Sequence, residues 1–301
     1  MSHALPPTID PTAANLWHAR APAISPWLHE EVARRMEDRL QWIAKPPVSW
    51  LDWEPVRGGI KAHGLVAARY PNAQSWIYES TTRRAEEAER VFGKSWWSVD
   101  RWKGKQPKFG LPSKEDGVGM LWANMQLHQV ADPQALLKQW HSALAVDGFV
   151  MFSCLGPDTL QELRAGYEKA EWPASGHSFT DMHDWGDMLV QAGFAEPVMD
   201  MERITLTFAT PERAIQELRE LGRNLHPHRF ASLRGKKWHT QLLSLLEGAL
   251  KNDEGSLSLT FEIVYGHAYK PSPRIKAAEQ SHVALDDMRA MLRQGRNGGL
   301  R

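Results

Sequence analysis

Cysteine is nearly absent from this sequence: Cys154 is the one thiol in 301 residues. A single cysteine cannot form an internal disulfide, so the chain is no disulfide-stapled module, and a reducing compartment such as the cytoplasm suits it. Paired-cysteine zinc motifs are excluded for the same reason. Because Cys154 lies within an apolar run, we interpret it as a small core residue rather than as a nucleophile.

Net charge and long apolar runs are also lacking. Lysine and arginine together number 36, as do aspartate and glutamate, so no overall charge draws the chain to nucleic acid or to an anionic membrane. No apolar run approaches the roughly twenty residues of a membrane-spanning helix. The N-terminus has neither the basic start nor the apolar core of a secretory signal. We therefore expect a cytoplasmic protein that binds neither nucleic acid nor membrane.

Several common motifs are missing as well. There is no G-x-S-x-G elbow and no phosphate-binding P-loop, which removes the commonest hydrolase and nucleoside-triphosphatase classes. The 13 histidines do not form an H-x-x-x-H pair on a helix. Their nearest groupings are His177 with His183 and His226 with His228, and neither has a cysteine partner. We therefore predict no metal site.

The stretch from Gly117 to Gly156 has the pattern of strand, helix and strand. An apolar run, VGMLWA, ends at Asn124, as expected of a strand buried on both faces. Asp132-Pro133 predicts a helix start, with aspartate as N-cap and proline in the first turn. Asp147-Gly148 is expected to end this helix before a second buried strand. The apolar residues of the helix share one face: Leu136, Leu137, Trp140 and Leu144.

Such a βαβ unit has a right-handed crossover, and ligands of parallel sheets bind beyond the carboxyl ends of the strands. The end of the first strand therefore belongs to the expected functional edge. It is marked by Asn124, and the end of the second strand by Gly156.

The same residues carry a family resemblance. A strand that ends in Asn, then xLHx, Asp-Pro, an amphipathic helix and DGFVMFSCLGPDTLQELR resembles a class I S-adenosylmethionine-dependent methyltransferase. Within that superfamily the chain is most similar to the BioC family, which methylates the free carboxyl of malonyl-acyl carrier protein in biotin synthesis. It also resembles a related mitochondrial complex I assembly factor. The likeness continues through FTDMHDWGDMLVQAGFAEPVMDMERITLTF, ELRELGRNLHP and LSLTFEIVYGHAYKP.

The resemblance implies an α/β fold: a mainly parallel, doubly wound sheet with a helical cap inserted before the last strand. The methyltransferase-like domain is expected at 27–270, with the cap within about 157–250. Residues 1–26, rich in proline and alanine, predict an extended N-terminal arm, and 271–301 predict a polar tail. The apolar stripe at 27–43 predicts a helix, which in BioC-like proteins helps to cover the pocket.

The loop after the first strand, VSWLDW, departs from the family. There the family has a glycine-rich loop, broadly D/E-x-G-x-G-x-G, because glycines let the backbone approach the methionine part of the cofactor. Asp52 matches the acidic position. Glu54 and Val56 stand at the first two glycine positions, and Gly58 and Gly59 are kept.

Two residues of this loop add to the departure. Pro55 fixes φ and removes a backbone donor, and Trp53 adds bulk. The loop is therefore either a remodelled cofactor loop or the remnant of a lost cofactor site. Of the two interpretations we favour the remodelled loop.

Three further residues match cofactor positions of the family. The strand AQSWIYE ends in Glu79, and an acid there accepts hydrogen bonds from ribose hydroxyls. Asp100, near a third predicted strand, is the candidate for the adenine amino group, and Trp102 is a candidate to stack on adenine. The residues predicted to hold S-adenosylmethionine are Asp52, Gly58, Gly59, Glu79, Asp100 and Asn124.

Basic residues cluster in the segments that cap the pocket in the family. A carboxylate substrate carried on a protein favours a bidentate arginine, and Arg223 is the first candidate, with His226 beside it. The alternative is a solvated helix end. The group RGKKW at 234–238 is a candidate contact for an acidic carrier protein, or else a solvated turn.

The resemblance supports two functions. The first is an S-adenosylmethionine-dependent methyltransferase that esterifies malonyl-acyl carrier protein or another carboxylate. Because the sulfonium is already activated, alignment and water exclusion suffice, and we predict no general base. The second is a non-catalytic relative whose scaffold and cap bind a protein partner, as an assembly factor would. HARAPAISPWLHEE also lacks the tyrosine that BioC-like enzymes place in the N-terminal arm.

Overall fold

A seven-stranded sheet forms the centre of the computed structural model, which describes residues 9–93, 105–113, 117–230, 232–252 and 254–273. The strand order is β3-β2-β1-β4-β5-β7-β6. The strands are β1 (Ser49–Trp53), β2 (Gln74–Tyr78), β3 (Lys108–Phe109), β4 (Val118–Ala123), β5 (Leu144–Leu155), β6 (Ala195–Phe208) and β7 (Leu257–Tyr269). Neighbouring strands from β3 to β5 are parallel, whereas β7 is antiparallel to both β5 and β6. The predicted α/β class with a mainly parallel sheet is confirmed.

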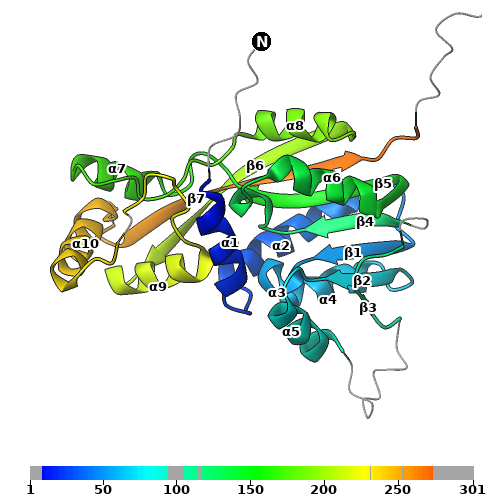
Figure 1. Ribbon diagram of the computed structural model, residues 1–301, viewed down its shortest axis with the longest axis horizontal. Helices are drawn as coiled ribbons and strands as arrows, with labels where there is room; N and C mark the ends of the chain where they lie inside the picture. The colour runs from blue at the N-terminus through cyan, green and yellow to red at the C-terminus, as the bar shows by residue number, and fades with distance from the viewer. Residues whose placement is uncertain (1–8, 94–104, 114–116, 231, 253, 274–301) are drawn as a thin grey trace, which may run out of the picture. The chain divides into compact units, whose positions relative to one another are not determined.

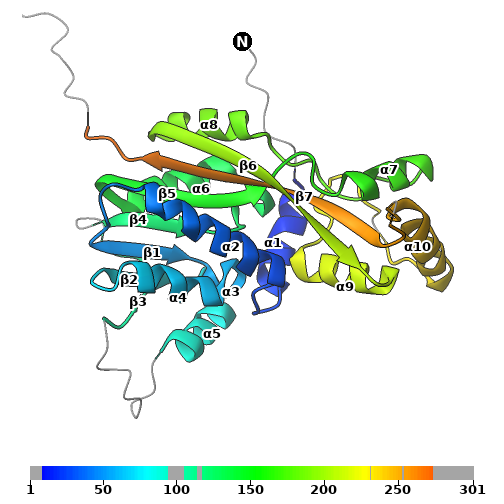
Figure 2. The same ribbon diagram turned by 180° about the vertical axis from the view of Figure 1, so that it is seen from behind.

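Helices cover both faces of the sheet. Figure 1 shows α6 and α8 in front of the strands, and Figure 2 shows α2 and α4 on the opposite face. The α-helices are α1 (Pro11–Arg20), α2 (Trp27–Arg39), α3 (Pro55–Gly58), α4 (Ile60–Arg69), α5 (Thr82–Phe92), α6 (Pro133–Ala143), α7 (Gln161–Lys169), α8 (Met182–Gln191), α9 (Pro211–Leu221) and α10 (Lys236–Ala249). The sheet is therefore doubly wound.

Alternation along the strands divides the core into two layers. Trp50 and Met120 point to the layer that α2 and α4 cover, and their neighbours Leu51 and Leu121 point to the layer under α6 and α8. Because successive strand residues face opposite sides, a strand buried on both faces must be apolar throughout. This accounts for the nearly unbroken apolar run of β4.

The cap consists of α7, α9 and α10, which gather at one end of the sheet (Figure 1). Strand β6 lies between α7 and α9 in sequence but pairs with β7 along its length. The expected insert at about 157–250 is therefore interrupted by a strand of the main sheet. The cap helices reach back over the carboxyl end of β5.

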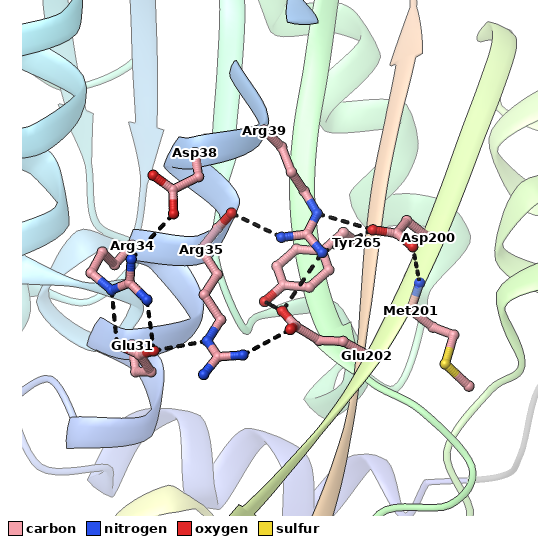
Figure 3. Close-up of polar contacts among 9 residues, drawn as sticks. All are labelled: Glu31, Arg34, Arg35, Asp38, Arg39, Asp200, Met201, Glu202 and Tyr265. Atoms are coloured by element: carbon pink, nitrogen blue, oxygen red, sulfur yellow. Dashed lines mark hydrogen bonds and ion pairs between the residues drawn. The ribbon is translucent and has the colours of Figure 1, made fainter. Parts of the chain in front are cut away.

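A polar network fixes α2 across the antiparallel end of the sheet (Figure 3). Arg35 and Arg39 donate to Glu202 and Asp200, each at 2.8 Å. The Arg39 guanidinium also lies 3.7 Å from the centre of the Tyr265 ring. The first turn of α2 is held beside the end of β4 by a separate contact, so this helix reaches the ligand edge of the sheet.

The described part of the predicted extended arm is instead helical. Asp10 caps α1 by accepting the N–H of Thr12 at 2.8 Å, and Pro11 occupies the first helical position. Trp17 of this helix is 7% exposed. The prediction of an extended segment was wrong because composition alone hides both the cap and the buried face.

The end of α6 also differs from the prediction. The helix stops at Ala143, and Leu144 already pairs with Val118 as the first residue of β5. Asp147, with φ 62°, and Gly148 lie within β5 at an irregularity of the strand pair. Pairing with β4 therefore takes Leu144 out of the helix face on which its spacing placed it.

Candidate functional site

Two cavities lie where the parallel strands end. The strand-end cavity has a volume of about 270 Å³, and its wall includes Trp53, Glu54, Arg57, Tyr78, Ser80 and Arg84. The cap cavity, of about 350 Å³, is bounded by β5, α7, α9 and α10, and its wall includes Leu163, Tyr167, Phe179, Leu218, Leu242 and Phe261. His29 and Gln129 line both cavities. The two cavities are therefore neighbours with a shared wall.

The altered loop after β1 folds as a single helical turn. Glu54 adopts the left-handed conformation, φ 56° and ψ 52°, and α3 follows directly. Gly59 has φ 151°, and a Cβ there would lie 2.9 Å from Cβ of Ala62. At Gly58 a Cβ would lie 3.1 Å from the carbonyl oxygen of Asn124. The two glycines of this loop are therefore needed for close packing between the loop, α4 and the end of β4.

Glu79 lies at the end of β2, as predicted, but it is bonded within the protein. One carboxylate oxygen accepts the N–H of Val56 at 2.8 Å, and the other accepts Nε–H of Arg84 at 3.0 Å. Burial, followed by the neighbouring charge of Glu54, raises the pKa of Glu79 to about 8. A ribose at this position would have to exchange with Arg84.

Arg84 is the most completely bonded side chain of the strand-end cavity. It is 2% exposed and donates to Ser80 Oγ at 3.1 Å and to the carbonyl oxygen of His18 at 2.7 Å, besides Glu79. A second ion pair, of 3.4 Å, joins it to Glu54. One buried guanidinium thus compensates two buried carboxylates.

Two of the predicted cofactor residues have partners inside the fold. Asp52 is 2% exposed and accepts a hydrogen bond from His63 at 2.8 Å, and burial raises its pKa. Asn124 donates to the carbonyl oxygens of His29, at 2.8 Å, and Gly58, and accepts Oγ–H of Ser153 at 2.6 Å. Neither side chain is in the wall of the strand-end cavity. Their contact with a cofactor stays a prediction.

Two further residues were predicted to contact the cofactor. Asp100 and Trp102, the candidates for adenine, lie outside the described residues. Among the residues that are described, no group of three or more metal-ligating side chains gathers in one place. Within the same part of the chain, no helix has the length and apolar character to cross a membrane.

Of the two predicted substrate residues, only Arg223 reaches a cavity. It lines the cap cavity, and its guanidinium lies 4.8 Å from the centre of the Trp17 ring. His226 lines neither cavity; its Nδ1 accepts the backbone N–H of His228 at 3.0 Å. The histidine belongs to a turn that shapes the cap.

Helix α1 brings residues to the site that the sequence did not point to. Trp17 donates its indole N–H to Gln129 at 2.6 Å, and Gln129 donates onward to Leu221 O at 3.3 Å. His18 of the same helix bonds Ser80 Oγ at 2.6 Å. Figure 1 shows α1 between α9 and α3. No local pattern predicts these contacts, because each joins segments far apart in sequence.

The shared wall carries a neutral histidine. His29 is 1% exposed, and its Nδ1 donates to the carbonyl oxygen of Arg57 at 2.7 Å, which leaves Nε2 as an acceptor. Burial, then the charge of Arg57, lowers the pKa of His29 to about 3. His29 therefore presents no charge to either cavity at neutral pH.

The strand order defines the class of protein. Five parallel strands in the order β3-β2-β1-β4-β5, continued by antiparallel β7 and then β6, form the sheet of a class I methyltransferase. Among solved structures, the YcgJ protein of Bacillus subtilis superposes with a TM-score of 0.52 at 11% identity, covering 80% of this chain and 100% of that one. At that identity the likeness supports the fold alone.

Sequence comparison supplies the family. The malonyl-[acyl-carrier protein] O-methyltransferase of Gallionella capsiferriformans is 37% identical over 262 residues, 82% of this chain and 86% of that protein. The protein of the same name from Laribacter hongkongensis is 36% identical over 258 residues, 82% and 84% of the two chains. No family model matches. The chain belongs to the malonyl-[acyl-carrier protein] O-methyltransferase family, and it is a methyltransferase that uses S-adenosylmethionine.

The strand-end cavity suits the chemical groups of that cofactor. S-adenosylmethionine has ribose hydroxyls, an ammonium group, a carboxylate and an adenine base with apolar faces. The cavity wall offers a carboxylate from Glu54, a cation from Arg57, and aromatic rings from Trp53 and Tyr78, and Glu79 lies behind Arg84 of the same wall. The residues present therefore fit the cofactor, although not through a glycine-rich loop.

Proposed function

We propose that this chain transfers a methyl group from S-adenosylmethionine to the free carboxyl of a malonyl group carried on acyl carrier protein, in biotin synthesis. The observation that carries the proposal is the pair of adjoining cavities. The more polar one lies at the strand ends, and the more apolar one lies under the cap; His29 and Gln129 separate them. Such an arrangement suits a reaction that brings a donor and an acyl acceptor together from two sides.

On the donor side we assign the ribose to Glu79. Its carboxylate lies at the end of β2, where parallel sheets bind nucleoside hydroxyls. Binding there exchanges the Arg84 contact for ribose hydroxyls, while the N–H of Val56 continues to hold the second oxygen. The cofactor itself supplies an activated methyl group, so the protein's task is to position it.

On the acceptor side we assign the carboxylate to Arg223. A free carboxyl is ionised at neutral pH, so it needs a cation to orient it but no base to deprotonate it. Burial lowers the pKa of His29, His128 and His177, which keeps these imidazoles neutral. The apolar wall of the cap cavity then excludes water from the acyl group.

The carrier protein would meet the cap from outside. Basic residues lie in the segment before α10 and in the first turn of α10: Arg234, Lys236 and Lys237. Arg234 is held over the ring of Trp238 at 4.2 Å. An acidic carrier would be steered to this surface by charge complementarity.

The proposal is tested by incubating the purified chain with S-adenosylmethionine and malonyl-acyl carrier protein. Mass spectrometry of the carrier should show a methyl ester on the malonyl group. Acetyl-acyl carrier protein, which lacks the free carboxyl, is the matched control and should stay unmodified. Methylation of both carriers, or of neither, would contradict the proposed acceptor.

A further inference from the structure

Arg57 is a buried cation that has no acidic partner in the part of the chain that the structure describes. It is 5% exposed and occupies the loop that replaces the family's glycine-rich turn. Its guanidinium donates only to backbone carbonyls: Ile24 O at 3.2 Å, Glu220 O at 2.8 Å and Leu221 O at 3.2 Å. Among the described residues, no carboxylate forms an ion pair with it. Arg84 in the same cavity, by contrast, has two.

The neighbouring cations affect the pKa of Arg57 more than the neighbouring carboxylates do. After burial itself, Arg84 and Arg223 are the largest influences and lower its pKa, to about 10, whereas Glu220 and Glu54 oppose them. The carbonyls at the end of α9 add a partial negative charge. Burying a full charge costs several kcal/mol unless a counter-charge or ligand compensates it. A cation in a cavity wall without a counter-charge is a candidate position for binding a ligand.

The backbone of the same loop has no donors to spare. In a glycine-rich loop the N–H groups are free for a ligand. Here the N–H of Val56 bonds Glu79, at 2.8 Å, and those of Gly58 and Gly59 bond within the helical turn, at 2.9 and 2.8 Å. The N–H of Arg57 bonds Glu54 O at 3.3 Å. Any donor that this loop gives to a ligand must therefore come from a side chain.

Position decides which carboxylate Arg57 would meet. It lines the strand-end cavity, whereas Arg223 lines the cap cavity. The guanidinium of Arg57 lies 5.4 Å from the centre of the Trp17 ring, and that of Arg223 lies 4.8 Å from it. Arg57 thus lies in the wall of one cavity and Arg223 in the wall of the other, which suits the two carboxylates of the proposed reaction.

We propose that Arg57 binds the carboxylate of the cofactor's amino-acid moiety, in place of the backbone N–H groups of a glycine-rich loop. This inference rests on the proposed function. Arg57 is a specificity-determining residue for the donor: it distinguishes a cofactor that has the α-carboxylate from one that lacks it. Arg84 has no such role, because its charge is already compensated by Glu54 and Glu79.

The test compares two ligands that differ only in this group: S-adenosylhomocysteine and its decarboxylated analogue. Calorimetric titration of the wild-type chain should show about 10- to 100-fold tighter binding of the carboxylate form, the range for a hydrogen bond to a charged group. Arg57→Met should bind both ligands equally. Arg57→Lys, which keeps the charge but loses the planar fork, should retain part of the preference.

A matched control and a folding check complete the experiment. Arg90→Gln removes an exposed arginine that pairs with Glu87 and should leave the preference unchanged. Thermal unfolding verifies that each variant is folded, and Arg57→Lys carries the test if Arg57→Met is not. A preference that persists in a folded Arg57 variant at its wild-type size overturns the inference and leaves the proposed function intact. No binding of either ligand to wild type overturns both.

Discussion

The two cavities of this enzyme are built by opposite means. The strand-end cavity is held by charges: Arg84 joins Glu54 and Glu79, and Arg57 joins the loop to the end of α9. The cap cavity is held by apolar side chains from α7, α9, α10 and β7. Buried charges are sensitive to the loss of one partner, whereas an apolar wall tolerates changes that conserve volume. The donor site should therefore be the more fragile of the two.

Arg84→Met should have the largest effect and would sharpen this contrast. It leaves Glu54 and Glu79 buried without their common cation, which typically destabilises a protein by about 3–5 kcal/mol. Urea unfolding measures the loss. The exposed pair of Arg90 and Glu87 is the control, and Arg90→Met should leave the stability close to that of wild type, because solvent screens an exposed ion pair. Equal losses in the two variants would show that the buried cluster is not what holds the strand-end cavity.

Glu79→Ala tests the donor side directly. If Glu79 holds the ribose, S-adenosylhomocysteine should bind more weakly by about 1–3 kcal/mol while the chain stays folded. Calorimetric titration of wild type and variant gives the difference. Unchanged affinity in a folded variant would remove Glu79 from the cofactor site.

Arg223→Gln tests the acceptor side of the comparison. The KM for malonyl-acyl carrier protein should rise about tenfold, near 1.4 kcal/mol, because one charged contact to the carboxylate is lost. The affinity for S-adenosylhomocysteine should stay at the wild-type value, since Arg223 lines the other cavity. A variant that weakens the donor and leaves the acceptor unaffected would reverse the assignment of the two cavities.

The pH dependence of stability is the most gradual of the expected effects. Burial and Glu54 raise the pKa of Glu79 to about 8 in the folded chain, above its unfolded value. Between these two pKa values the folded state holds more protons than the unfolded state. Unfolding free energy should then fall as pH rises through this window, by at most about 1.4 kcal/mol per pH unit. Glu79→Gln keeps the shape but cannot titrate, and should flatten this part of the profile. Identical profiles for the two proteins would contradict the raised pKa.

Local patterns accounted for much of the fold. The apolar run of β4, the Asp132-Pro133 helix start and the acid at the end of β2 each depend on neighbours within a few residues. Short-range periodicity and capping decide such features, so they can be read from the chain. The family resemblance then supplied the doubly wound sheet, the cap and the methyl donor.

The contents of the site followed from long-range contacts instead. Trp17 meets Gln129 across 112 residues, and His18 meets Arg84 across 66, so neither helix α1 nor its place over the site could be inferred from composition. The partners of Asn124 and the lone charge of Arg57 were equally hidden. The sequence by itself determined the scaffold and where its strands end, because local propensity and burial pattern set them. Only the tertiary structure decided which charges at that edge are already paired and which are left for a ligand, because pairing depends on segments that meet only after folding.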